Sequence, residues 1–146
     1  MKYKSSRGFT LIELLIVIVV LSLLTVIATV SYQDSVRKAR RGDAKAVLLE
    51  LAQLMERNYT ETNRFDKDTA DADYSLPFNT SPKDGTKTYY NITLPTPTLT
   101  SQTFILQAAP TGTQRKDTRC MTLTLDNTGT KGMIGGSSTA AECWAR

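Results

Sequence analysis

The amino-acid sequence predicts an α+β fold, in which one long N-terminal α-helix packs on an antiparallel β-sheet of three to four strands and a disulfide bounds a C-terminal loop. Three observations predict it. An apolar run free of glycine and proline fills residues 9–30, and a stretch with apolar residues at spacings of three and four follows. Short segments of alternating polarity come next. Both cysteines, Cys120 and Cys143, lie near the C-terminus.

The apolar run is long enough to cross a membrane. A helix over 9–30 would reach about 33 Å, and the hydrocarbon core of a bilayer is roughly 30 Å thick. A basic segment with Lys2, Lys4 and Arg7 precedes it. A secretory signal peptide is the main alternative, but its apolar core is shorter and ends at a small-residue cleavage site. The sequence therefore predicts a basic leader over 1–8 and a transmembrane helix over 9–30.

Glu13 is the one charged residue in this run. A carboxylate deep in a bilayer costs roughly 2.5–3.5 kcal/mol on insertion scales, and the run offers no Lys, Arg or His as its partner. Two interpretations stay open. Either Glu13 lies near the headgroups at the membrane edge, or it pairs with a positive group created later. Cleavage after Gly8 would create one, because Phe9 would then carry a new α-amino group.

Residues 31–63 continue the helix with an amphipathic pattern. Gly42 is the weakest point of this helix, because glycine in a helix interior is about 1 kcal/mol less favourable than alanine. Asn63 is expected to supply the left-handed residue that ends the helix. The helix is thus predicted from Phe9 to about Thr62. Its apolar stripe consists of Ala44, Val47, Leu48, Leu51, Ala52, Met55 and Tyr59.

Residues 64–87 are expected to form a connecting loop, since Asp, Thr, Pro and Gly are frequent there. Four of its aspartates, Asp66, Asp68, Asp71 and Asp73, raise the question of a calcium site. The spacing does not fit an EF-hand, because Pro77 stands where the bidentate glutamate is needed. A solvated acidic loop is expected, with no metal and no cofactor.

The region 88–146 is predicted to hold the sheet. Polarity alternates around Tyr90–Leu94, Phe104–Ala108 and Met121–Leu125, and a turn follows at 126–129. Residues 132–142 are expected to form a loop that Cys143 ties back to Cys120. The bond would close about 24 residues and contribute roughly 3 kcal/mol. It requires an oxidising compartment, and the alternative is a pair of unpaired buried thiols.

Composition argues against an enzyme. The chain has 18 Lys and Arg residues, 14 Asp and Glu residues and no His, for a net charge of +4. Without histidine, His-based triads and the usual acid–base group at neutral pH are excluded. Three of the basic residues lie in the leader, so the chain without it is nearly neutral.

The leader followed by Gly8-Phe9-Thr10-Leu11-Ile12-Glu13 and a long apolar helix resembles the class III signal of type IV prepilins. The resemblance implies that a membrane-embedded prepilin peptidase cuts between Gly8 and Phe9 and methylates the new N-terminus at Phe9. It implies that Glu13 then pairs with the N-terminal amine of a neighbouring subunit during assembly. The implied partners are other pilin subunits, the peptidase, the inner membrane and the pilus assembly machinery.

Further segments resemble the PilE-like minor-pilin branch: Ala46–Glu50, Met55–Tyr59, Asn63–Phe65 and the Cys143-Trp144 ending. This implies a structural subunit of a type IV pilus that serves adhesion, twitching motility or DNA uptake. It would reside in the bacterial inner membrane before assembly and in the extracellular pilus afterwards. The chain departs from many pilins at Val30, where proline is common, and at Ser22, where glycine is frequent. An unbroken helix is therefore expected.

Two alternatives are a DNA-receptor minor pilin for natural transformation and a type II secretion pseudopilin. For the first, Arg115, Lys116 and Arg119 precede Cys120, and a disulfide would bring Lys131 and Arg146 towards them. Such residues more often form a solvated loop, and no aromatic residue is interleaved with them. Pseudopilins often lack the C-terminal disulfide, so the two cysteines favour the pilus.

Overall fold

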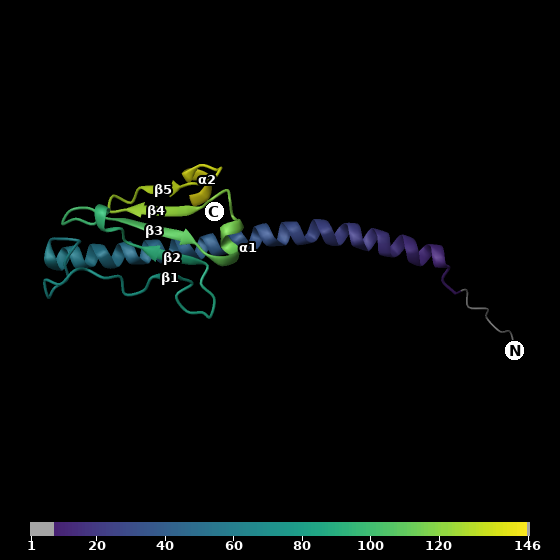
Figure 1. Ribbon diagram of the computed structural model, residues 1–146, viewed down its shortest axis with the longest axis horizontal. Coiled ribbons are helices and arrows are strands. Elements are labelled where there is room, and N and C mark those ends of the chain that lie inside the picture. The colour runs from purple at the N-terminus through teal and green to yellow at the C-terminus, as the bar shows by residue number, and fades with distance from the viewer. Residues whose placement is uncertain (1–7, 146) are drawn as a thin grey trace. The chain divides into compact units, whose positions relative to one another are not determined.

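The structure, a computed structural model, describes residues 8–145, without the side chains of 26–28 and 30. The leader residues 1–7 and Arg146 therefore lie outside the described part. The chain divides into two compact units, Met1–Val36 and Arg37–Arg146. One helix, α1 (Leu11–Thr62), contributes to both (Figure 1).

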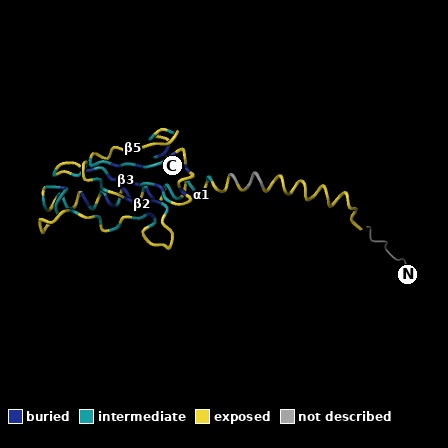
Figure 2. Tube along the Cα trace, in the orientation of Figure 1, coloured by how far each residue is buried: buried dark blue, intermediate teal, exposed yellow. Residues whose placement is uncertain are grey.

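In the first unit, α1 exposes its apolar side chains (Figure 2). Its few hydroxyls bond to the helix itself: Ser22 donates to the carbonyl of Val19 and Thr25 to that of Leu21. No polar group of these two side chains is left without a partner. Within the part of α1 whose side chains are described, no stretch is long and apolar enough to cross a membrane.

The second unit combines the rest of α1 with a five-stranded antiparallel sheet in the order β1-β2-β3-β4-β5. The strands are β1 (Thr80–Ser81), β2 (Tyr90–Thr93), β3 (Ile105–Pro110), β4 (Thr122–Asp126) and β5 (Lys131–Ile134). Two 3₁₀ helices, η1 (Thr96–Thr98) and η2 (Gly112–Lys116), and a short helix, α2 (Ala140–Trp144), complete it. Figure 1 shows β2, β3 and β4 following one another beside α1.

The core lies between the helix stripe and one face of the sheet. Alternate residues of β2, β3 and β4 are buried, as the two-residue period of a strand requires. Phe65 packs edge-on against Phe104 with ring centroids 4.9 Å apart. The buried apolar residues are Ala44, Val47, Leu48, Leu51, Met55, Phe65, Tyr90, Ile92, Phe104, Leu106, Ala108, Cys120, Leu123, Leu125 and Cys143.

The end of α1 and the β4–β5 turn agree with the sequence predictions. Asn63 follows α1 with φ 57°, the left-handed conformation expected there. In the turn, Asp126 accepts hydrogen bonds from the backbone N–H groups of Thr128 and Thr130. Gly129 has φ 79°, which glycine adopts at no steric cost.

The prediction of three to four strands was too low. Strand β1 has two residues and lies within 64–87, which was expected to be loop only. Residues 132–142 were also expected to be a loop, yet 132–134 belong to β5 and 140–142 to α2. Strand β5 was not predicted because glycine, here Gly132, is uncommon in strands. The close pairing with β4 requires it, since a Cβ at this position would lie 2.4 Å from the Thr124 hydroxyl oxygen. Helix α2 is set by a capping box between Thr139 and Glu142.

The acidic loop is held by ion pairs. Arg64 contacts Asp66 at 2.7 Å and Lys67 contacts Asp73 at 2.7 Å. Asp68 accepts the backbone N–H groups of Ala70 and Ala72. These carboxylates organise the loop.

The disulfide joins Cys120 to Cys143 with a Cα–Cα distance of 5.6 Å and a sequence separation of 23. It ties α2 to the segment that enters β4. The indole N–H of Trp144 adds a hydrogen bond of 2.9 Å to the carbonyl of Gly132, on the edge strand β5. The C-terminal segment is therefore fixed at two points.

Candidate functional site

The first candidate site is the N-terminal turn of α1. Gly8, Phe9 and Thr10 precede the helix and are exposed. The Glu13 carboxylate accepts the backbone N–H of Thr10 at 2.9 Å and its hydroxyl at 2.8 Å. The hydroxyl oxygen of Thr10 in turn accepts the backbone N–H of Glu13 at 3.3 Å. This reciprocal pair is a capping box, with Thr10 at the N-cap and Glu13 at the third helical position.

The capping box was not predicted, although its Thr-x-x-Glu signature can be found in the sequence. A positive partner for Glu13 was expected from its charge, whereas its partner in the structure is the neutral Thr10, three residues before it. The box orients the carboxylate towards the start of the helix.

The second candidate site is a cavity of about 240 Å³, which we call the basic pocket. One side of it comes from α1, where Lys38, Arg41 and Lys45 follow one another at spacings of three and four and so share a helix face. The other side comes from the segment before the disulfide and from the chain around α2. Its lining residues are Lys38, Arg41, Gly42, Lys45, Arg119, Cys120, Ser138, Glu142 and Ala145.

Lys45 is half-buried in this pocket, and its ammonium group donates to the carbonyl oxygen of Ala145 at 2.7 Å. Its pKa is lowered by burial first, and then by the positive charges of Arg41 and Lys131. In the described part of the chain, Glu142 is the one acid that lines the pocket. Its pKa is lowered by hydrogen bonds from the Ser138 hydroxyl and the Thr139 backbone N–H, with a smaller effect from Arg119.

A buried polar network supports the pocket from behind. Arg41 contacts Asp117 at 3.1 Å, and their side chains are only 12% and 6% exposed. The side-chain amide of the fully buried Gln114 donates to the carboxylate of Asp117 at 3.3 Å and to the hydroxyl of Tyr90 at 2.9 Å. It also donates to the carbonyl of Arg37 at 3.2 Å. The network therefore fastens η2 to both α1 and β2.

Tyr90 gives this network a pH dependence. Burial raises the pKa of its phenol to about 12, although the hydrogen bond from Gln114 acts in the opposite direction. Since the folded-state pKa lies above the unfolded value of about 10, this stabilisation is complete below pH 10 and is lost as pH rises towards 12.

We expect the wild-type chain to lose about 2–3 kcal/mol more unfolding free energy between pH 9 and 12 than Tyr90→Phe loses. The phenylalanine variant has no phenol to ionise, whereas lysines and other tyrosines titrate equally in both chains. Urea unfolding at a series of pH values measures this difference. Parallel pH profiles of the two chains would refute it.

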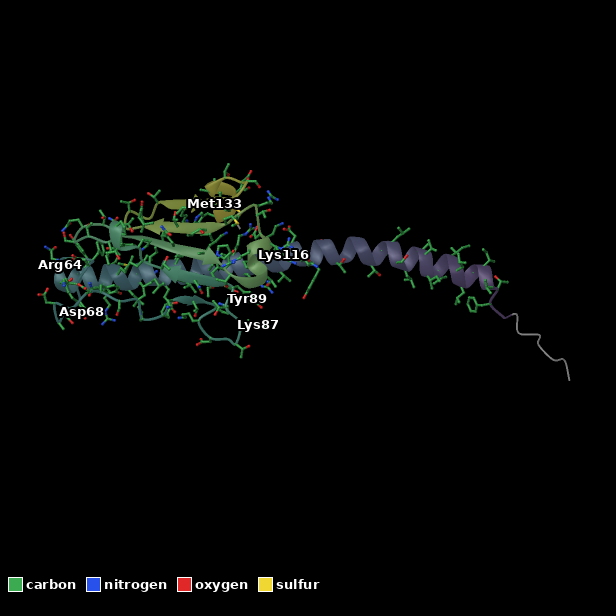
Figure 3. All side chains as sticks on the ribbon, viewed as in Figure 1. Arg64, Asp68, Lys87, Tyr89, Lys116 and Met133 are labelled. Carbon is green, nitrogen blue, oxygen red and sulfur yellow. A yellow bond between two sulfur atoms is a disulfide. The ribbon has the colours of Figure 1, made fainter. Side chains whose placement is uncertain are left out.

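The structure distributes the predicted DNA-binding residues over two neighbouring regions. Arg119 lines the basic pocket, and Lys131 is near enough to Lys45 to lower its pKa. Arg115 and Lys116 are exposed on η2, outside the lining. Figure 3 shows Lys116 at the end of the folded unit opposite Arg64 and Asp68. Arg146 lies outside the described residues.

Aromatic residues near these cations were missed by the sequence argument. The Arg40 guanidinium lies 3.7 Å from the ring centroid of Tyr89, and the Lys131 ammonium lies 5.7 Å from that of Trp144. Arg40 also donates to the hydroxyl of Thr113 on η2. These pairs join residues far apart in the sequence, so no local sequence pattern predicts them.

Comparison with known proteins is consistent with the fold and the N-terminus. A family model described as type IV minor pilin ComP, DNA uptake sequence receptor, matches residues 30–124, and a prokaryotic N-terminal methylation motif matches 3–29. The non-core minor pilin PilV of Neisseria meningitidis is 26% identical, with a TM-score of 0.50, over 73% of this chain and 94% of that one. A type IV pilin from Shewanella oneidensis is 24% identical, with a TM-score of 0.43, over 75% and 99%. A search of curated proteins found no significant match.

A long N-terminal helix on an antiparallel sheet, a C-terminal disulfide and an N-terminal methylation motif are together typical of a type IV pilin, and the matched family model describes a minor pilin. The model match covers well over half of the chain. The chain therefore belongs to the family of the type IV minor pilin ComP, DNA uptake sequence receptor.

Proposed function

We propose that this minor pilin binds DNA through one basic face, formed by the basic pocket together with Arg115, Lys116 and Lys131. The observation that carries the proposal is the convergence of basic residues from α1 and from the region around the disulfide, where Glu142 is the one acid among the described lining residues. Lys and Arg neutralise backbone phosphates and release counterions, which supplies most of the non-specific affinity for DNA. The family description supports the same ligand.

The second part of the proposal is that this chain is processed and assembled into a pilus. The prepilin peptidase would cut after Gly8 and methylate Phe9, and the Glu13 carboxylate would meet the new amine of a neighbouring subunit. The apolar half of α1 would hold the subunit in the inner membrane and then join the filament core. Such head-to-tail contacts do not close on themselves and therefore build filaments. The pilus would thus carry the basic face outside the cell.

We expect the full chain, in uncharged detergent micelles, to bind duplex DNA with an affinity that falls steeply with salt. Neutralising Arg115 and Arg119 together, as glutamines, should lower the magnitude of the slope of log K against log salt by about two, one for each phosphate contact. Fluorescence anisotropy at several salt concentrations measures it. Lys83→Gln is the matched control, because Lys83 pairs with Glu50 outside the basic face. Absence of binding at low salt would end the DNA proposal.

We expect Glu13→Ala to be processed after Gly8 but to reach the pilus fraction at least tenfold less than wild type. The Glu13→Gln variant separates two causes, because glutamine can keep the capping box with Thr10 but carries no charge. Both variants should fail if the charge guides docking. Intact mass reports processing, and immunoblots of sheared pili report incorporation. Normal piliation by Glu13→Gln would assign the role to the helix cap instead.

A further inference from the structure

Among the described residues that line the basic pocket, cations outnumber acids. Arg41 is paired with Asp117, but Lys45 is bonded to a neutral carbonyl oxygen. Glu142, the acid among the described lining residues, accepts hydrogen bonds from the Ser138 hydroxyl and the Thr139 backbone N–H. Among the described residues, neither Lys45 nor Arg119 has a carboxylate within ion-pair distance.

We propose that the basic pocket is a site for one phosphate group, held by Lys45 from α1 and Arg119 from the C-terminal region. The phosphate can be part of a DNA backbone, in which case the site rests on the proposed function, or it can be free inorganic phosphate. A cavity of about 240 Å³ is roomy enough for a tetrahedral oxyanion. Lys45 supplies a compact charge with further N–H donors, and Arg119 supplies a planar fork suited to two oxygens.

Gly42 is a place on α1 at which a side chain can be added beside the pocket. It lies on α1 between Arg41 and Lys45 in the lining, and a Cβ at this residue would meet nothing within 4 Å. A side chain added there therefore enters free space and not the packed core. Packing therefore does not require glycine at this position, and the two variants of the test can be made here.

Burial strengthens the attraction for an anion. Lys45 is half-buried, so its charge acts through a medium of lower effective dielectric constant than water. Its pKa is lowered by burial and by neighbouring cations. A bound phosphate reverses the second effect, and binding is therefore expected to weaken at high pH as Lys45 loses its proton.

The test uses the full chain in uncharged detergent micelles and inorganic phosphate as the probe. Phosphate titrated at constant ionic strength, with chloride as the balancing anion, should shift the NMR signals of the Lys45 and Arg119 side chains with one common affinity. Gly42→Glu places a carboxylate beside the cations and should weaken phosphate binding at least tenfold. Gly42→Gln has the same size without the charge and should stay within about threefold of wild type. Equal shifts with acetate and phosphate would overturn the assignment to phosphate.

The DNA arm of the test uses Lys45→Gln. This variant should bind DNA with a salt slope smaller in magnitude by about one, and Lys83→Gln should not. If phosphate binds but Lys45→Gln leaves the DNA slope unchanged, the pocket takes free phosphate and the backbone assignment is wrong. If wild type binds DNA but phosphate shifts neither side chain, the pocket proposal is overturned and DNA binding stands. Failure of wild type to bind DNA would defeat the proposed function and the backbone assignment, while the phosphate titration still decides whether the pocket binds free phosphate.

Discussion

Replacing Asp117 with alanine is expected to lower the free energy of unfolding by about 3–5 kcal/mol. The variant leaves the Arg41 guanidinium in place with its side chain only 12% exposed, and removes the carboxylate 3.1 Å from it. An uncompensated buried charge is costly because little water can reach it. Gln114 loses an acceptor in the same step. Urea unfolding followed by far-UV circular dichroism measures the loss.

A double replacement distinguishes the cost of the orphaned charge from the value of the ion pair. Arg41→Met together with Asp117→Leu removes both charges and fills the space with apolar atoms. Buried pairs replaced in this way are often neutral or stabilising, so the double variant should recover most of the lost stability. The ion-pair explanation fails if Asp117→Ala costs less than about 1 kcal/mol, or if the double variant is less stable than the single one.

The sequence contained enough information for the framework of the fold. The apolar stripe from Ala44 to Tyr59 has a 3.6-residue period, which identifies one face of a helix without knowledge of its partner. Asn63 identified the end of α1 because few other residues adopt positive φ. The central strands β2, β3 and β4 were predictable because their inward residues are apolar and alternate with polar ones.

The edge strands were missed for a physical reason. Strand β1 has two residues and β5 has four, one of them Gly132, so neither carries a long alternating pattern. Edge strands are half-paired, and their formation depends on the neighbour more than on their own composition. Helix α2 is similarly short and depends on its Thr139 cap and on the disulfide at Cys143.

The two candidate sites also differ in how much of each could be predicted from the sequence. The N-terminal motif is contiguous, and the residues from Gly8 to Glu13 could be assigned roles from the resemblance alone. The basic pocket joins α1 to residues some 75 to 100 positions later, through Arg41–Asp117 and Lys45–Ala145. Sequence reasoning therefore found Arg119 and Lys131 but left Lys45 out of the group. The charge of Lys45 becomes relevant only when the chain has folded.

Reducing the disulfide of the wild-type chain is expected to lower the free energy of unfolding by about 3 kcal/mol, since the bond joins cysteines with a sequence separation of 23. The core should survive, because helix α1 and strands β2 to β4 hold most of the buried apolar side chains. DNA affinity should fall with the stability. The reason is that Cys143 fixes the segment in which the Ala145 carbonyl accepts a hydrogen bond from Lys45. Cys120 directly follows Arg119, so the same bond also fixes Arg119.

Reduction is a better comparison than substitution, because both cysteines are almost fully buried and a serine would add an unpaired hydroxyl to the core. The same chain is measured with and without a reductant, by urea unfolding for stability and by anisotropy for DNA. Loosening of the C-terminal segment alone predicts weaker DNA binding while the far-UV spectrum stays unchanged. If reduction lowers the stability and leaves the DNA affinity intact, the disulfide only stabilises the fold. The basic face then does not depend on the C-terminal segment that the disulfide fixes.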